Sequence, residues 1–273
     1  MFKKAKEFKK KLAAYYKEEE NKKVAIFYVT LRFLVIICLI REIFMGNYHN
    51  VFLCVLTLVL FIIPFFIEEK FKVSIPSVLE IIILLFIFSA EILGEIQNFY
   101  NIFPNWDMIL HTLNGFLAAA IGFSLIDFLN RTEKIDFEMS PLFVALVSFC
   151  FSMTVGVVWE FFEYSADTLF KSDMQKDTIV TRISSVSLDD AEDFNPKTIN
   201  DISKTVIYYG DNQSIIIPNG YLDIGLIDTI EDLLVNFIGA ITFSTLGYFY
   251  IHKRDKYKGI EHFIPKRKKL KES

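Results

Sequence analysis

Cysteine is scarce in this chain, which has three such residues among 273. Cys38, Cys54 and Cys150 all lie inside apolar blocks, so the sequence predicts buried free thiols and no external disulfide. Their spacing also excludes a metal site built on paired thiolates. The chain is therefore not a disulfide scaffold, and any bound metal has to be held by other side chains.

The sequence signatures of several enzyme classes are missing as well. There is no Gly-x-Ser-x-Gly nucleophile elbow and no paired basic and histidine motif of lipid phosphatases, so serine and phosphohistidine chemistry have no support. No glycine-rich loop follows a predicted strand, so nucleotide binding is not indicated. Membrane topology and anionic lipid account for the basic termini, and no nucleic-acid partner is expected.

Apolar residues are abundant instead, and they are gathered in long blocks. Hydrophobic residues make up 53% of the sequence, and 29 residues are phenylalanine. Blocks of about 20 apolar residues are long enough to cross a bilayer as helices. The sequence predicts an all-α membrane bundle of six transmembrane helices, at about 24–44, 51–67, 76–96, 107–129, 140–163 and 225–251.

The charges of the connecting segments predict how this bundle is oriented. Lys and Arg occur in residues 1–23, 68–72, 131–134 and 253–271, whereas residues 46–50 and 97–105 contain neither. Because positively charged loops stay in the cytoplasm, both termini are expected on the cytoplasmic side of a bacterial cytoplasmic membrane. Residues 1–23 form either an amphipathic helix on anionic lipid or a solvated charged segment.

Five segments follow from this topology. They are a basic cytoplasmic lead-in (1–23), five spans (24–164), an extracytoplasmic insert (165–224), a sixth span (225–251) and a basic cytoplasmic tail (252–273). Within the insert, the β-branched runs 205–209 and 214–217 flank residues 210–213, which include Gly210 and Asn212. This pattern predicts a β-hairpin in a small antiparallel sheet between the fifth and sixth helices.

Four of the predicted spans carry acidic, histidine or amide side chains in helical stripes. Asp107, His111 and Asn114 are spaced i, i+4 and i+7, so a helix places them on one face. With a rise of about 1.5 Å per residue, polar residues of the third, fifth and sixth spans reach a similar external level. The predicted intramembrane site consists of Glu91, Glu95, Asp107, His111, Asn114, Glu160, Glu163, Asp228, Asp232 and Asn236.

So many carboxylates cannot all be ionised in a low-dielectric environment unless positive charge is supplied. A divalent metal is one source, and His111, Glu160, Asp232 and Asp107 are its candidate ligands. An imidazole with several carboxylates suits Zn, Mn, Fe or Mg. A metal-free headgroup or ion site and a purely structural hydrogen-bonded belt are the alternatives. At the inner side, Arg32 is expected to form a structural ion pair with Glu80 or Asp127, or to snorkel.

Three motifs carry a resemblance to known families. They are Trp106-Asp107-x-x-x-His111-x-x-x-Gly115, Glu160-x-x-Glu163-Tyr164 and Asp228-Thr229-x-x-Asp232-x-x-x-Asn236-x-x-Gly239-Ala240. They resemble the YjdF-like family of bacterial multi-spanning membrane proteins and, more distantly, the VanZ-like family. The VanZ-like family is associated with low-level teicoplanin resistance, so this resemblance implies a cell-envelope setting and no defined reaction.

The sequence thus leaves three functions open. The first is an outward-facing intramembrane site for a divalent cation or a lipid-type envelope molecule, with membrane lipids around it. If this protein is an enzyme, a metal-activated water attacking a lipid-linked ester or phosphate is the simplest chemistry. The second is a transporter or ion pathway, and the third is a structural or interaction protein whose acids only bond helices together.

Overall fold

A computed structural model describes residues 22–130, 139–189, 195–254 and 256–267 of the chain. Almost all of the predicted lead-in lies outside the described residues, and so do Arg131 and Lys134 of one predicted cytoplasmic loop. The described chain divides into two compact units. Unit 1 comprises residues 1–156 and 235–273, and unit 2 comprises residues 157–234.

Among the described residues, six helical stretches are long and apolar enough to cross a membrane, which confirms the predicted fold class. Two of them are composite. Proline at the start of α4 separates it from α3, and α5 continues as the π-helix η2. The spans are α2 (Lys22–Met45), α3 with α4 (Tyr48–Leu60, Ile63–Phe71), α5 with η2 (Ser77–Phe88, Ser89–Ile96), α7 (Trp106–Asn130), α8 (Pro141–Phe170) and α9 (Leu226–His252).

Helix starts follow the local sequence signals. Pro141 is the first residue of α8, where its missing N–H costs nothing, and the Ser140 hydroxyl accepts a hydrogen bond from Phe143 N at 3.3 Å. A short helix, α6 (Phe99–Ile102), connects η2 to α7. Helix α8 ends at Phe170, beyond the predicted end of the fifth span near residue 163.

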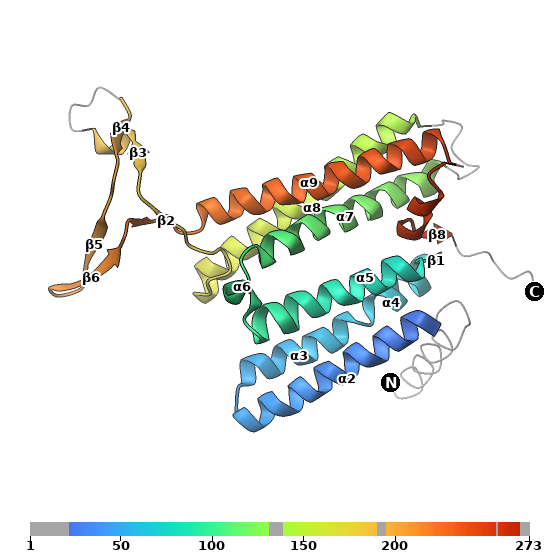
Figure 1. The fold of residues 1–273 in the computed structure, drawn as a ribbon, viewed down its shortest axis with the longest axis horizontal. Coiled ribbons are helices and arrows are strands. Elements are labelled where there is room, and N and C mark those ends of the chain that lie inside the picture. Colours follow the sequence, from blue (N-terminus) through green and yellow to red (C-terminus); the bar gives the residue numbers. More distant parts are fainter. Residues whose placement is uncertain (1–21, 131–138, 190–194, 255, 268–273) are drawn as a thin grey trace, which may run out of the picture. The chain divides into compact units, whose positions relative to one another are not determined.

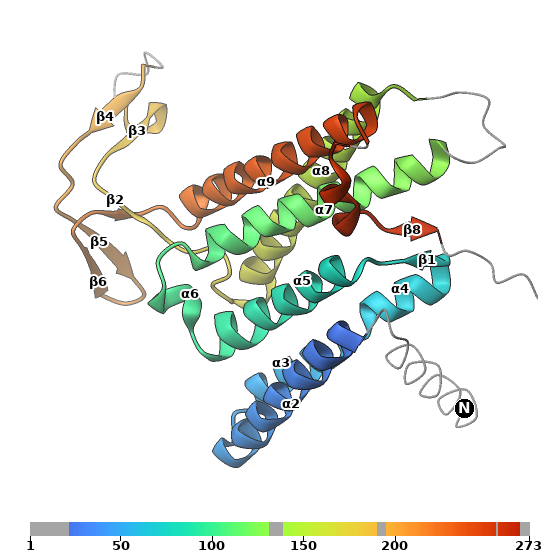
Figure 2. The same ribbon diagram turned by 45° about the vertical axis from the view of Figure 1, so that its right-hand side comes forward.

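In unit 1, α2, α3 and α5 lie side by side (Figures 1 and 2). Every third or fourth residue of α2 is buried against them, including Tyr28, Leu31, Val35 and Cys38. A second core, around Phe123 and other residues of α7, α8 and α9, lies between those helices. Unit 1 is thus built from apolar faces at helical spacing, as a bundle requires.

The predicted burial of the cysteines is correct for two of the three. Cys38 and Cys54 are buried free thiols, whereas Cys150 is exposed. The buried residues on that part of α8 are Ser148 and Ser152, one turn apart. Cys150 lies two residues from each of them, so the helix turns it to the opposite face.

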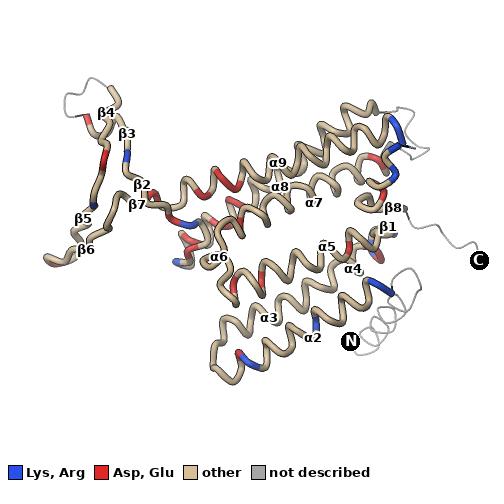
Figure 3. Tube along the Cα trace, in the orientation of Figure 1, with Lys and Arg blue, Asp and Glu red and all other residues tan. Residues whose placement is uncertain are grey.

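The chain after α9 folds back onto unit 1. The 3-10 helix η4 (Lys258–Phe263) and the residue after it bury Ile260 and Ile264 in the core around Phe123. Strand β8 (Lys266–Arg267) then pairs antiparallel with β1 (Val73–Ser74), which lies between α4 and α5. The predicted basic tail therefore contains a packed segment. Figure 3 shows the Lys and Arg residues just beyond α9.

Unit 2 contains the C-terminal end of α8, the N-terminal end of α9 and the segment between them. Its strands form three separate antiparallel pairs: β2 (Ile179–Val180) with β7 (Tyr221–Leu222), β3 (Ile183–Ser185) with β4 (Lys197–Ile199), and β5 (Lys204–Tyr209) with β6 (Gln213–Pro218). A 3-10 turn, η3 (Val186–Leu188), follows β3. Tyr209 faces Gln213 across the turn, which confirms the predicted hairpin. The orientation of the spans in the membrane stays a prediction.

Candidate functional site: a buried acidic triad

Three carboxylates converge inside unit 2. Glu160 and Glu163 extend from α8 and Asp232 from α9, and one oxygen of each lies within 4.8 Å of the others. Their exposed fractions are 4%, 6% and 2%. The i, i+3 spacing puts both glutamates on one face of α8, toward the carboxylate of α9. The sequence prediction that these acids point inward and meet is realised at these three positions.

A tryptophan on the same helix orients one member of the triad. The indole Nε1 of Trp159 donates a hydrogen bond to Oε1 of Glu163 at 2.8 Å. Trp159 is half-exposed, and its indole N–H holds the buried carboxylate of Glu163 in place. Trp159 was not among the predicted site residues, although its i, i+4 spacing to Glu163 is a signal that the sequence contains.

The neighbouring acids of unit 2 have a different role, because they hold the loop between α8 and β2. Asp167 accepts hydrogen bonds from Ser172 Oγ and from the backbone N–H groups of Met174 and Gln175, at 2.7–2.9 Å. Asp228 Oδ2 accepts one from Lys176 N at 2.8 Å. Asp228 was predicted as a site residue, but its carboxylate anchors this loop.

One acid of this loop, Asp177, has a pKa that its surroundings shift. Partial burial raises the pKa of Asp177, and the nearby carboxylates of Asp173 and Asp223 raise it further. The carboxylates of Asp173 and Asp223 thus lie close enough to that of Asp177 to interact with it.

In unit 1, the predicted pair on α7 is present. His111 Nε2 lies 3.5 Å from Asp107 Oδ1, an ion pair when the imidazole is protonated. His111 is buried, and Asp107 is partly exposed. The prediction that this pair shares one layer with the acids of α8 and α9 would join the two units, and it stays a prediction.

An amide pair links α7 to α9 within unit 1. Asn114 Nδ2 donates to Asn236 Oδ1 at 3.3 Å, and Asn236 is fully buried. Gly115 makes this possible, because a Cβ there would run into the Asn236 carbonyl. Gly156 of α8 likewise leaves room for the Asn236 side chain. Small residues at membrane helix crossings permit such approaches.

Below the amides, the polar stripe continues as buried serines. Ser152 Oγ donates to Gly115 O at 2.7 Å, and Ser148 Oγ donates to Ala119 O at 2.6 Å. Ser244 Oγ reaches Ser148 Oγ at 3.3 Å. These hydroxyls bond one helix to the next, as polar groups do between membrane helices.

The other predicted residues are placed elsewhere. Glu91 and Glu95 lie on the π-helix η2, where Glu95 is exposed. Arg32 does not form the predicted ion pair with Glu80 or Asp127 in the described part of the chain. Its guanidinium donates to the Tyr28 hydroxyl at 2.8 Å, because that group lies one turn earlier on the same helix.

Arg41 of α2 forms an ion pair within unit 1. It pairs with Glu42, which is 2% exposed, at 2.6 Å. Asn50 adds a second hydrogen bond to that carboxylate, at 2.9 Å. Glu42 and Asn50 were not among the predicted site residues. Their contact joins α2 to α3, which spacing along a single helix does not reveal.

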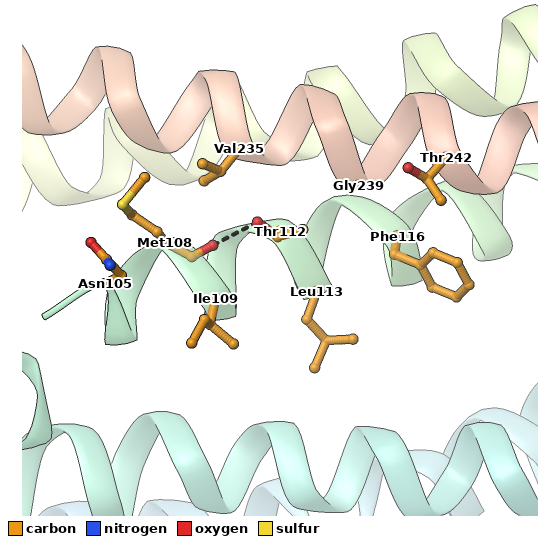
Figure 4. A pocket seen from close by; sticks show the side chains of 9 residues that line it. All are labelled: Asn105, Met108, Ile109, Thr112, Leu113, Phe116, Val235, Gly239 and Thr242. Carbon is orange, nitrogen blue, oxygen red and sulfur yellow. Dashed lines mark hydrogen bonds between the residues drawn. The ribbon is translucent and has the colours of Figure 1, made fainter. Parts of the chain in front are cut away.

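A groove of about 580 Å³ runs along α7 and α9 in unit 1 (Figure 4). Asn105, just before α7, lines one end of it, and one face of α7 contributes Met108, Ile109, Thr112, Leu113 and Phe116. Helix α9 contributes Val235, Gly239 and Thr242. Apart from Asn105 and the two threonines, the lining is apolar.

Comparison with known proteins identifies a membrane-protein family. A family model described as "Predicted membrane protein (DUF2238)" matches residues 26–253. An uncharacterized protein of Thermotoga maritima is 24% identical over 106 residues, which are 39% of this chain. The aligned part covers 53% of that relative, so the chain spans about half its length. No solved structure matches the chain. The YjdF-like and VanZ-like resemblances stay predictions.

Proposed function

This chain belongs to that membrane-protein family, and on this premise we propose that it binds a divalent cation through Glu160, Glu163 and Asp232. The observation that supports the proposal is the convergence of three buried carboxylates from two membrane-spanning helices. Two unit charges 4 Å apart interact by about 4 kcal/mol at an effective dielectric constant of about 20. Three ionised carboxylates at this separation therefore favour a bound cation or shared protons.

The donor set indicates which cations fit. Oxygen ligands on opposite sides of a Mg²⁺ or Ca²⁺ ion lie roughly 4 to 5 Å apart, which matches the spread of the triad oxygens. Carboxylate oxygens alone favour Mg²⁺ or Mn²⁺. The proposed function is thus a metal-assisted site within the membrane, whose ligand at the metal is a lipid-type envelope molecule or water.

Titration of Mn²⁺ into the purified protein tests this proposal. We expect one Mn²⁺ to bind per chain, and Asp232→Asn to weaken its binding at least about tenfold, or ~1.4 kcal/mol. At about 100 times Kd, Mn²⁺ should raise the free energy of unfolding by about 2.7 kcal/mol. Glu231→Gln is the matched control, because Glu231 is the adjacent acid on α9 and is exposed.

Two outcomes would contradict the proposal. One is a wild-type protein that takes up no Mn²⁺, and the other is an Asp232→Asn variant that binds it as well as Glu231→Gln does. In the second case the triad is a hydrogen-bonded belt between helices, and Glu160→Gln and Asp232→Asn should lower the free energy of unfolding. The serines that bond α8 and α9 to their neighbours favour that structural function.

An ion pathway would require polar groups to be accessible further along the bundle. Ser148, Ser152 and Ser244 are 0–5% exposed, and the hydroxyls of the first two donate to carbonyl groups of α7. These contacts support a closed binding site in preference to a pathway. Flux measurements in proteoliposomes with Ser148→Ala would test it, since a pathway through the serines predicts altered flux.

A further inference from the structure

We propose that the groove along α7 and α9 holds one acyl chain of a membrane phospholipid. This site lies within unit 1 and does not rest on the cation proposed above. Its length fits the ligand. From Asn105 to Phe116 the α7 wall rises roughly 16 Å at about 1.5 Å per residue. One leaflet contributes about 15 Å, half of the ~30 Å hydrocarbon core.

The chemistry of the wall also fits a hydrocarbon chain. The two threonines direct their hydroxyls to their own helices: Thr112 Oγ1 donates to Met108 O, and Thr242 Oγ1 to Ile238 O, both at 2.7 Å. Figure 4 shows the first of these bonds inside the groove. With those hydroxyls bonded, the Asn105 amide at one end is the polar group that remains in the lining. Its place at the mouth suits the ester or headgroup level of a lipid.

The groove is continuous with the lipid-facing surface of the spans. Ile109, which lines it, is 57% exposed, and Ile238 and Ile241 on the adjacent face of α9 are about half-exposed. These helices cross the bilayer, so acyl chains are the medium that surrounds this surface. The groove volume of 580 Å³ is within the range of small-molecule sites. It is therefore larger than a gap between packed side chains.

The end of the groove opposite Asn105 is closed by aromatic rings. Phe116 packs edge-to-face on Phe243 of α9 at 5.0 Å and on Phe263 of η4 at 5.4 Å. Phe263 belongs to the C-terminal segment that folds back onto the bundle. The segment therefore supplies part of the stop that limits how deep a chain can reach.

The test measures phospholipid that remains on the protein after purification in mild detergent, by lipid mass spectrometry. Thr242→Trp places an indole in the groove and should remove most of the retained phospholipid. The matched control is Ile241→Trp, a neighbouring exposed position of α9 outside the groove, which should retain the wild-type amount. Met108→Trp fills the groove from α7 and gives the same expected loss if Thr242→Trp fails to fold.

The proposal is overturned if both groove variants retain as much phospholipid as Ile241→Trp. It is also overturned if cross-linking places a second copy of the chain in the groove and Thr242→Trp abolishes that dimer.

A second measurement tests the aromatic rings that close the groove. Phe263→Ala should shift the retained lipids toward longer acyl chains, and an unchanged chain-length distribution would show that Phe263 sets no limit.

Discussion

The acids of α8 and α9 show how the surroundings of a residue decide its role. Asp228 and Asp232 lie one turn apart on the same helix. Asp228 accepts a hydrogen bond from the backbone N–H of Lys176 in the loop between α8 and β2, whereas Asp232 is buried beside two glutamates. The backbone N–H of Lys176 gives the Asp228 carboxylate a hydrogen-bond donor, whereas clustered carboxylates favour a bound cation or shared protons. The second arrangement is the one expected of a binding site.

At the same scale, Gly115→Ala tests how tightly α7 and α9 approach. The added Cβ would meet the backbone carbonyl of Asn236, which cannot move without shifting α9. We expect a loss of about 1–3 kcal/mol in the free energy of unfolding, measured by denaturation in detergent. Gly259→Ala is the control, since open space surrounds that position, and its stability should match wild type. Equal stability of the two variants would refute the close approach.

At the scale of elements, irregular pieces do more than connect spans. The π-helix η2 ends the third span, and π-helical turns are often found at functional sites. The C-terminal segment ties the start of α5 to the α7–α9 core through β8, Ile260 and Ile264. A second contact, an ion pair, holds η4 to the strand that follows it. Lys266 Nζ donates to Glu261 Oε2 at 2.7 Å.

That ion pair predicts a pH dependence of the segment. The Lys266 ammonium holds the pKa of Glu261 below its ordinary value of 4.5. A lowered folded pKa contributes stability above the ordinary value, and the contribution is lost as pH falls through the folded pKa. Because both groups are partly exposed, we expect at most about 0.5–1 kcal/mol.

Hydrogen exchange of the amides from Ile264 to Lys266 measures this effect. Wild type should be better protected than Glu261→Gln when both are labelled at pH 6, and the difference should shrink as the labelling pH falls below 4.5 and through the lowered pKa of Glu261. Lys266→Gln should reproduce the Glu261→Gln result. A difference that persists at low pH would show that packing of Ile260 and Ile264 holds the segment without the ion pair.

At the scale of the whole molecule, the chain combines a membrane bundle with a β-rich insert between α8 and α9. The insert's hairpin exposes apolar side chains on both faces, among them Tyr208 and Ile216 on one face and Ile207 and Ile215 on the other. Isolated two-stranded hairpins are only marginally stable.

Labelling of single cysteines tests the predicted topology. In a cysteine-free background, Asn212→Cys in the hairpin turn should react with a membrane-impermeant maleimide in intact cells. Lys258→Cys, just after α9, should react only after the membrane is permeabilised, because loops rich in Lys and Arg stay inside. The reverse pattern would invert the assigned orientation, and labelling of both in intact cells would contradict the sixth span.

The sequence by itself determined the number and approximate position of the spans, the hairpin and the identity of the three acids that form the triad. It did so because apolar length, turn residues and helical spacing are local properties of the chain. The exposure of Cys150 and the end of α8 at Phe170 could not be predicted in the same way, because the neighbouring helices decide which face of a helix is covered.

Only the tertiary structure decided which polar residues meet. Glu160, Glu163 and Asp232 form a triad because α8 and α9 turn those faces toward each other. Asp228 instead binds the loop between α8 and β2, a contact that helical spacing does not predict. The groove depends on residues over a hundred positions apart, and so does its aromatic stop. Such contacts arise from packing between distant segments, which no local pattern in the sequence encodes.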